Sequence, residues 1–391
     1  MPTNAYVITK EINDVSSWRA KTSLLDGLDI ELTERCNNNC IHCCINLPQD
    51  DMDAKNKELS GEEIKNILKE AKALGCINVK FTGGEPLLRE DFAELYLFAR
   101  RLGLRVSIFT NAILITPKLA DLFVREVPLE GIEITVYGMK KRSYEAVTRT
   151  AGSFEAAWRG INLLLEKRVP FVVKTALLPP NKEEIIEFEK WAATIPWMIK
   201  PPSYALFFDL RCRREEEKNE GIRRLRLSAA EGLKVLTRRK DNYIKEMKGF
   251  CAKFVHPPGE KLFSCGSGLG SGCVDAYGVF QPCLMLRHPD CLYNLKTGSL
   301  KDAKEKFFPK MREKKANNPD YLKRCANCFL KGLCEQCPAK SWAEHGTLDT
   351  PVEYLCEIAH TQARFLGLIR ENEKAWEIKN WKKRISNFIN R

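Results

Sequence analysis

The chain has 391 residues, which is too long for one small core, so we expect two or three domains. Apolar residues make up 44% of the chain, which is too high a share for a disordered protein. No apolar run reaches the ~18 residues of a membrane span, and residues 1–18 carry charge throughout without the apolar core of a secretion signal, which predicts a cytoplasmic protein without membrane segments. Sixteen cysteines in a large chain of this kind favour metal ligation over disulfides.

Strand-like and helical segments alternate through the first half of the chain. Residues 1–27 form a lead-in without a clear period. Apolar runs then predict six strands, at 28–32, 77–82, 105–110, 131–136, 170–177 and 204–210. Helical patterns lie between them, the first opened by a capping box of Ser60 and Glu63 and the others near 91–102, 116–126, 153–168 and 182–194. This order predicts an α/β fold with a parallel sheet, either open or curved into a partial barrel.

The pattern changes after residue 210. Residues 211–249 begin with a charge-dense stretch, which predicts a solvated linker, and continue into a helix over 228–239. Residues 250–360 are rich in cysteine and glycine and poor in periodic runs, which predicts a small, loop-rich domain supported by metal rather than by apolar burial alone. Residues 361–391 are expected to be a helical tail with a basic outer face.

Three cysteines follow the first predicted strand. Cys36, Cys40 and Cys43 have the spacing C-x3-C-x2-C. Three thiolates bind three irons of a [4Fe–4S] cube and leave the fourth iron open for a small molecule. This position is at the carboxyl end of a parallel sheet, where active sites gather. The alternative is a zinc site with His42 as the fourth ligand.

The cysteine run CNNNCIHC and the later Thr82-Gly83-Gly84-Glu85-Pro86 together resemble the signature of radical S-adenosylmethionine (SAM) enzymes. The resemblance implies a partial (β/α)6 TIM-like barrel over residues 28–210. It also implies that the open iron binds SAM, that SAM is cleaved to a 5′-deoxyadenosyl radical, and that this radical removes a hydrogen atom from a substrate.

The same resemblance implies SAM contacts outside the cluster. In the family, the GGEP motif meets the SAM ammonium, and residues at the ends of the third and fourth strands and an arginine before a Gly-Ser-Phe run reach the rest of SAM. Tyr137 departs from the aspartate that relatives carry there, and no catalytic residue is assigned. The residues expected to contact the cofactor are His42, Gly83, Gly84, Glu85, Pro86, Asn111, Thr135 and Arg149.

The C-terminal cysteines resemble the SPASM domain, which holds two auxiliary [4Fe–4S] clusters, although the last short gap is two residues rather than three. By that resemblance, the nearer cluster takes Cys265, Cys273, Cys283 and Cys337, with Cys251 or Cys291 as possible replacements for Cys273. The farther cluster takes Cys325, Cys328, Cys334 and Cys356. The alternative is a pair of structural zinc sites, because paired CxxC motifs are also a zinc-ribbon pattern. Cys44, Cys76 and Cys212 are expected to be ordinary small buried residues.

The family resemblance favours the modification of a ribosomally made peptide or protein side chain, by crosslinking or oxidation, with the auxiliary clusters handling electrons. One alternative is radical chemistry on a small molecule such as a porphyrin side chain. Another is a non-catalytic zinc scaffold that binds nucleic acid.

The expected partners are a peptide or small protein, a separate leader-recognition protein, and an electron donor such as flavodoxin or ferredoxin. A separate recognition protein is expected because the first strand is predicted as early as residue 28. Nucleic acid is not expected, because the thiolates of three clusters would lower the net charge from +12 to +7 and no aromatic–basic stripe is present.

Overall fold

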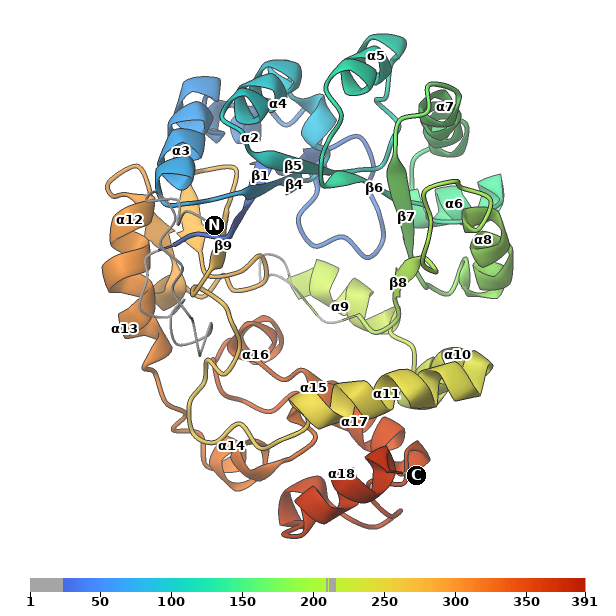
Figure 1. Cartoon of the computed structure of the whole chain (residues 1–391), viewed down its shortest axis with the longest axis vertical. Coiled ribbons are helices and arrows are strands. Elements are labelled where there is room, and N and C mark those ends of the chain that lie inside the picture. The colour runs from blue at the N-terminus through green and yellow to red at the C-terminus, as the bar shows by residue number, and fades with distance from the viewer. Residues whose placement is uncertain (1–23, 209, 211–215, 391) are drawn as a thin grey trace, which may run out of the picture.

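A curved sheet of parallel strands forms the first half of the protein (Figure 1). The computed structural model describes residues 24–208, 210 and 216–390. Six strands pair in parallel in the order β1-β4-β5-β6-β7-β8. Their bounds are β1 (Gly27–Thr33), β4 (Asn78–Gly83), β5 (Arg105–Thr110), β6 (Gly131–Thr135), β7 (Phe171–Ala176) and β8 (Ser203–Ala205). The predicted α/β fold with a partial barrel is confirmed.

Helices cover the outer face of this sheet. They are α3 (Gly61–Ala73), α4 (Phe92–Arg101), α5 (Pro117–Arg125), α6 (Lys141–Thr148), α7 (Ser153–Glu166) and α8 (Ile185–Ala192). Alternate strand residues such as Ile30, Phe81 and Ile108 are buried in the core shared with these helices. The residues between them, such as Glu31 and Thr82, therefore face the inside of the curve.

The predicted capping box at the start of α3 is present. The Glu63 amide donates to the Ser60 hydroxyl at 3.3 Å, and the Glu63 carboxylate accepts the Ser60 amide at 2.8 Å. Ile64, Leu68 and Ala71 then repeat at helical spacing and are almost completely buried. The helix therefore begins where local hydrogen bonds satisfy its first amides and where its apolar stripe meets the sheet.

Helix α9 (Glu216–Arg224) occupies part of the segment that was expected to be a charged linker. Its outer face carries the charges that suggested a loop, whereas Asn219 and Ile222 are buried. In Figure 1 this helix lies inside the open side of the curved sheet. The last strand of the barrel is also shorter than predicted, because β8 ends at Ala205. Cys212 and the start of the expected linker lie outside the described residues.

The cysteine-rich half continues the same sheet. Strand β9 (Ser271–Val274) pairs in parallel with β1 on the side opposite β4, and β10 (Val279–Gln281) and β11 (Tyr293–Asn294) extend it in antiparallel fashion. Helix α11 (Lys240–Phe254) crosses the position at which the sequence predicted the start of the C-terminal domain. The two halves are therefore joined by sheet pairing as well as by the chain.

Short helices make up the rest of the chain. They are α2 (Met52–Lys57), α10 (Ala229–Leu236), α12 (Leu300–Asp302), α13 (Phe308–Arg312), α14 (Pro319–Lys323), α15 (Lys331–Cys334), α16 (Pro338–His345), α17 (Glu353–Phe365) and α18 (Trp381–Ile389), with a two-stranded pair of β2 (Arg35–Cys36) and β3 (Leu47–Pro48). A second, smaller core gathers α11, α15, α17 and α18 around Phe329 and Leu330. Within the described part of the chain, no helix has the length and apolarity needed to cross a membrane.

Candidate active site and cysteine clusters

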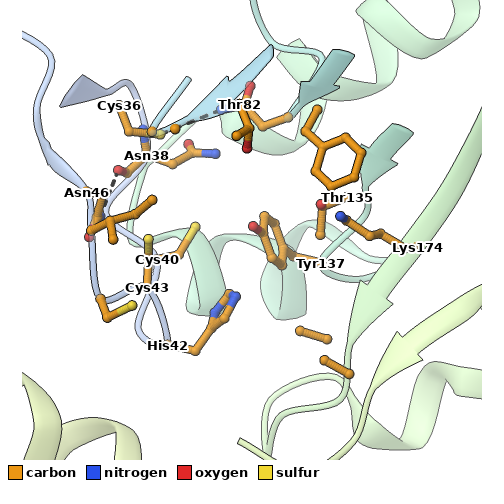
Figure 2. Close-up of a pocket in the computed structure, with 18 of the residues that line it drawn as sticks. Cys36, Asn38, Cys40, His42, Cys43, Asn46, Thr82, Thr135, Tyr137 and Lys174 are labelled. Carbon is orange, nitrogen blue, oxygen red and sulfur yellow. Dashed lines mark hydrogen bonds between the residues drawn. The ribbon is translucent and has the colours of Figure 1, made fainter. Parts of the chain in front are cut away.

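The loop after β1 places Cys36, Cys40 and Cys43 on one side of a cavity of about 300 Å³. Figure 2 shows the three thiols on this loop, facing the ends of the barrel strands across the cavity. The loop is held to the end of α6, because the amides of Asn39 and Ile41 donate to the carbonyls of Thr148 and Val147, both at 2.9 Å. The position of the cysteines is therefore fixed by backbone hydrogen bonds to the barrel.

The two glycines of the GGEP motif pack against the start of this loop. The Gly84 amide donates to the Thr33 carbonyl at 2.8 Å, and a Cβ on Gly84 would lie 2.2 Å from the Arg35 carbonyl oxygen. A Cβ on Gly83 would lie 2.1 Å from the Thr33 carbonyl oxygen. Both glycines also line the cavity. They are needed here for close contact between two backbone segments, in addition to the approach to a ligand that the sequence suggested.

Glu85 and Pro86 do not line the cavity. The Glu85 carboxylate is completely buried and accepts the Thr110 hydroxyl and the Asn111 amide, both at 2.8 Å. Burial raises the pKa of Glu85 from 4.5 to about 7. Pro86 is buried at the start of a 3₁₀ turn (Pro86–Leu88). In this structure Glu85 braces the ends of β4 and β5 from behind the cavity wall, rather than presenting its carboxylate to a ligand.

Asn111 lies beside the first cysteine and lines the cavity. Its side-chain amide donates to the Asn37 side chain at 2.7 Å and lies 3.9 Å from the Cys36 sulfur. The Asn38 amide lies 3.4 Å from the same sulfur. Burial, and next the charge of Glu85, raise the pKa of the Cys36 thiol to about 12. A thiol of this kind ionises when a metal replaces its proton.

The opposite wall carries polar, aromatic and charged side chains. Thr135, Tyr137 and Lys174 line it, with the predicted His42 at the lower edge of the loop (Figure 2). The His42 ring lies edge-on to Tyr137, with ring centroids 5.3 Å apart. Lys174 lies over the Phe109 ring, 3.9 Å from its centroid. Lys174 was not predicted, although its place near the end of a strand was a usable signal.

A second unpredicted cation reaches the cavity from the C-terminal half. Arg287 lines the cavity and donates to both carboxylate oxygens of Glu31, at 2.8 and 2.7 Å. Burial is the main cause that raises the pKa of Glu31, and Arg287 opposes it. Arg287 follows Cys283 by four positions, so this contact joins the predicted auxiliary region to the barrel. No sequence motif marked it.

Arg149 is not brought to the cavity. It is exposed and ends α6 in the left-handed conformation, with φ of 52°. Because α6 stops there, the carbonyls of Val147 and Thr148 remain available to hold the cysteine loop. Arg149 therefore does not line the cavity in this structure and contributes through the end of the helix, and its contact with SAM stays a prediction.

Four of the C-terminal cysteines surround a second, smaller cavity of about 30 Å³, which we call the farther site. They are Cys325, Cys328, Cys334 and Cys356. Burial, and next the charges of Cys334 and Cys356, raise the pKa of Cys325 to about 12. All four residues line this one small cavity, so they are neighbours in the fold. The donor set fits a four-thiolate cluster, and it is the set that the resemblance implied.

The remaining predicted ligands, the nearer site, are only partly brought together. Burial is the main cause that raises the pKa of Cys283, and the charge of Cys265 adds to the rise. Burial likewise raises the pKa of Cys337, and the charge of Cys283 adds to that rise. Cys273 is completely buried on β9 opposite Asp29, and the charges that act on its thiol after burial include those of Glu31 and Asp29. The charge of Cys283 contributes, after burial, to the raised pKa of Cys291. The ligand set of the nearer site stays a prediction.

Among the described residues, no three His, Cys, Asp or Glu side chains are close enough to hold a single metal ion. A single zinc ion needs its ligands within about 2.3 Å. An iron–sulfur cube is larger than one ion and holds its cysteines farther apart.

Comparison with known proteins gives matches to both halves. Residues 30–192 match the model of the Radical SAM superfamily. The AdoMet-dependent heme synthase of Methanosarcina barkeri is 26% identical over 342 residues, which cover 81% of this chain and 92% of that protein. The Fe-coproporphyrin III synthase of the same organism is 31% identical over 154 residues, or 39% of this chain and 37% of that protein.

Among solved structures, SuiB of Streptococcus suis bound to S-adenosylmethionine superimposes with a TM-score of 0.63. The match covers 87% of this chain and 79% of that chain at 18% identity. SuiB has also been solved with its precursor peptide SuiA, with a TM-score of 0.62. At this identity the likeness establishes the shared fold.

Proposed function

Because this chain is a radical SAM enzyme with the fold of SPASM-domain relatives, we propose that it removes hydrogen from a carboxylate-bearing side chain of a tetrapyrrole. The observation that carries the proposal is the match to a heme synthase through both halves of the chain, over 92% of that protein. The sequence favoured a peptide substrate, with a porphyrin side chain as the alternative. The alternative has the better support, because the likeness to the peptide-bound SuiB extends to the fold alone.

The residues around the first cavity suit this chemistry. Bound by Cys36, Cys40 and Cys43, a [4Fe–4S] cluster with SAM would supply the 5′-deoxyadenosyl radical that takes the hydrogen atom. The loop would hold that cluster without rearrangement, because its backbone is fixed by α6 and β4. Asn111 and Thr135 line the same cavity as the three cysteines, and in the proposal they would orient SAM beside the cluster.

The cavity also offers recognition of an anionic, flat molecule. Among the described residues that line it, Lys174 and Arg287 are basic and Glu31 is the acidic side chain. Lys174 pairs with Glu133 and Arg287 with Glu31, so a carboxylate group of the substrate would join or replace these ion pairs. Aromatic rings on several elements provide stacking surface for a planar macrocycle. They are Phe109, Tyr137, Tyr204, Phe207 and Phe208.

The overall step balances for a propionate side chain. A propionate held in this cavity would lose one hydrogen atom from the carbon next to the ring to the 5′-deoxyadenosyl radical. It would then lose its carboxylate as CO₂ and give up one electron, which would leave a vinyl group. The electron needs a one-electron acceptor, a role suited to an iron–sulfur cluster.

The test is anaerobic incubation of the reconstituted protein with SAM, a strong reductant and an iron coproporphyrin. We expect the tetrapyrrole to stimulate 5′-deoxyadenosine formation, and mass spectrometry to show loss of CO₂ and two hydrogens from each converted side chain. The variant with Cys36, Cys40 and Cys43 changed to Ala is the control. If a peptide stimulates SAM cleavage and the tetrapyrrole does not, the proposal is wrong and the result favours the peptide substrate that the sequence predicted.

A further inference from the structure

The farther site lies among positive charges. The guanidinium of Arg324 lies 3.8 Å from the Cys356 sulfur and 4.9 Å from the centroid of the Trp376 ring. Glu353 fixes it through two hydrogen bonds of 2.7 and 2.9 Å. The Arg324 side chain is only 18% exposed, whereas that of Glu353 is 70% exposed. The cation is therefore held against the sulfur on the protein side, while its carboxylate partner faces water.

A second cation lies at the same site, because Lys331 lines the cavity of the farther site. Lys331 also donates to the Gln336 carbonyl, which holds it in place. Two basic side chains thus lie beside a set of four thiolate ligands.

The first cysteine loop has a different environment. The contacts to the Cys36 sulfur come from neutral amides, those of Asn38 and Asn111. The two sites therefore differ in the groups that contact their sulfurs, which are neutral amides at the first loop and a guanidinium at the farther site, as well as in the number of thiolates.

The potential of an iron–sulfur cluster depends on its net charge, on hydrogen bonds to its sulfurs and on solvent exposure. A nearby cation stabilises the reduced form, which carries one more negative charge. We propose that Arg324 raises the reduction potential of the cluster at the farther site and so makes that site an electron acceptor relative to the SAM-binding cluster. This inference rests on the proposed four-cysteine ligand set and is independent of the identity of the substrate.

The test is a potentiometric titration of the reconstituted full chain, followed by paramagnetic resonance. The Cys36, Cys40 and Cys43 to Ala background removes the signal of the first cluster. We expect Arg324→Gln to lower the midpoint potential of one auxiliary cluster by at least about 59 mV, which is a tenfold change in the one-electron equilibrium. Lys323→Gln removes the same charge from the neighbouring exposed residue and should change it much less.

Glu353→Gln provides a test of opposite sign. It removes the carboxylate that partly neutralises Arg324, so we expect the midpoint potential of the same cluster to rise. Arg324→Lys keeps the charge and should fall between wild type and Arg324→Gln. If Arg324→Gln fails to bind about eight irons, Glu353→Gln and Arg324→Lys still decide the matter. Equal shifts in Arg324→Gln and Lys323→Gln, or a lowered potential in Glu353→Gln, would overturn the inference. A substrate other than a tetrapyrrole would leave these values unchanged, so the two proposals fail separately.

Discussion

The first cysteine loop and the farther site bind the same kind of cluster in the proposal, but the chain builds them in different ways. The first loop is held by backbone bonds to α6 and to the end of β4, elements that belong to the large core of the barrel. The farther site is made by short helices and turns over a small second core. We therefore expect the first site to keep its shape without a cluster, and the second to depend on its cluster for much of its stability.

Changing Cys36, Cys40 and Cys43 together to Ala should have the largest effect, and it tests the difference between the first cysteine loop and the farther site. SAM cleavage should be abolished, since the open iron is lost. Iron should fall from about twelve to about eight per chain, and the fold should remain because the loop is held by its backbone. Product analysis and iron determination measure both. Deoxyadenosine formation at the wild-type rate would contradict the assignment of the site.

Cys356→Ala should have the opposite effect, in that the C-terminal region changes while SAM cleavage continues. It removes one thiolate from the farther site, so we expect altered auxiliary iron and a destabilised C-terminal region, by several kcal/mol. SAM cleavage without substrate should continue, because the barrel is untouched. Iron content, the resonance spectrum and hydrogen exchange over residues 325–356 provide the measurements. If iron and spectrum match wild type while Cys337→Ala changes them, a sequential ligand set replaces the interleaved one.

Gly84→Ala tests whether the first loop depends on backbone packing. The added Cβ would meet the Arg35 carbonyl oxygen at 2.2 Å, so the loop must shift, at a cost of about 1–3 kcal/mol in unfolding free energy. We expect SAM cleavage to fall while auxiliary iron is retained. Gly249→Ala is the matched control, because no atom lies within 4 Å of its Cβ position on α11. Equal losses in both variants would show that the close contact is not the cause.

The buried carboxylate behind the first loop predicts a pH dependence of barrel stability. The pKa of Glu85 is about 7 in the folded chain and 4.5 ordinarily, so the folded state binds the extra proton. Stability of the cluster-free protein should therefore fall as the pH rises from 4.5 to 7, by up to about 3 kcal/mol, and level off above 7. Denaturant unfolding of wild type and Glu85→Gln measures this. The slope should be smaller in the variant, because Glu31 and Asp275 are buried carboxyls whose pKa is also raised. An unchanged slope would assign the titration to these other groups.

The smallest effect is expected at Arg149. Because this side chain is exposed and ends α6, Arg149→Ala should change stability by no more than about 0.5 kcal/mol. The KM for SAM should stay within about twofold. A large rise in this KM would support the contact between Arg149 and SAM that the family resemblance implied. Arg149→Gly separates the backbone role, since glycine adopts the left-handed conformation without strain.

The strands and the first cysteine loop could be predicted because their signals are local. Apolar runs of strand length lie where the six parallel strands are, and the capping box of Ser60 and Glu63 needs only four consecutive residues. The cysteine spacing likewise fixed which thiols share a loop. In each case the information lies within a few residues of the structure that it specifies.

The parts that were missed depend on distant contacts. Helix α9 was not predicted because its charges suggested a linker. In the structure, however, Ile222 of this helix is buried and lines the cavity of the barrel. Arg287 meets Glu31 from more than half the chain away, and Cys273 lies in a strand that only pairing with β1 defines. No periodicity in the sequence reports such contacts, so they required the structure.

The pairing of β9 with β1 has a consequence for synthesis of the protein. Gly27 pairs with Ser271, which is 244 positions later. At about 5–20 residues per second, a ribosome needs roughly 12 to 50 seconds to cover that distance. During this interval β1 has no described partner on one side, and an unpaired strand edge is a site of aggregation. A fragment that stops at the end of the barrel would keep that edge permanently, so we expect it to aggregate where the full chain does not.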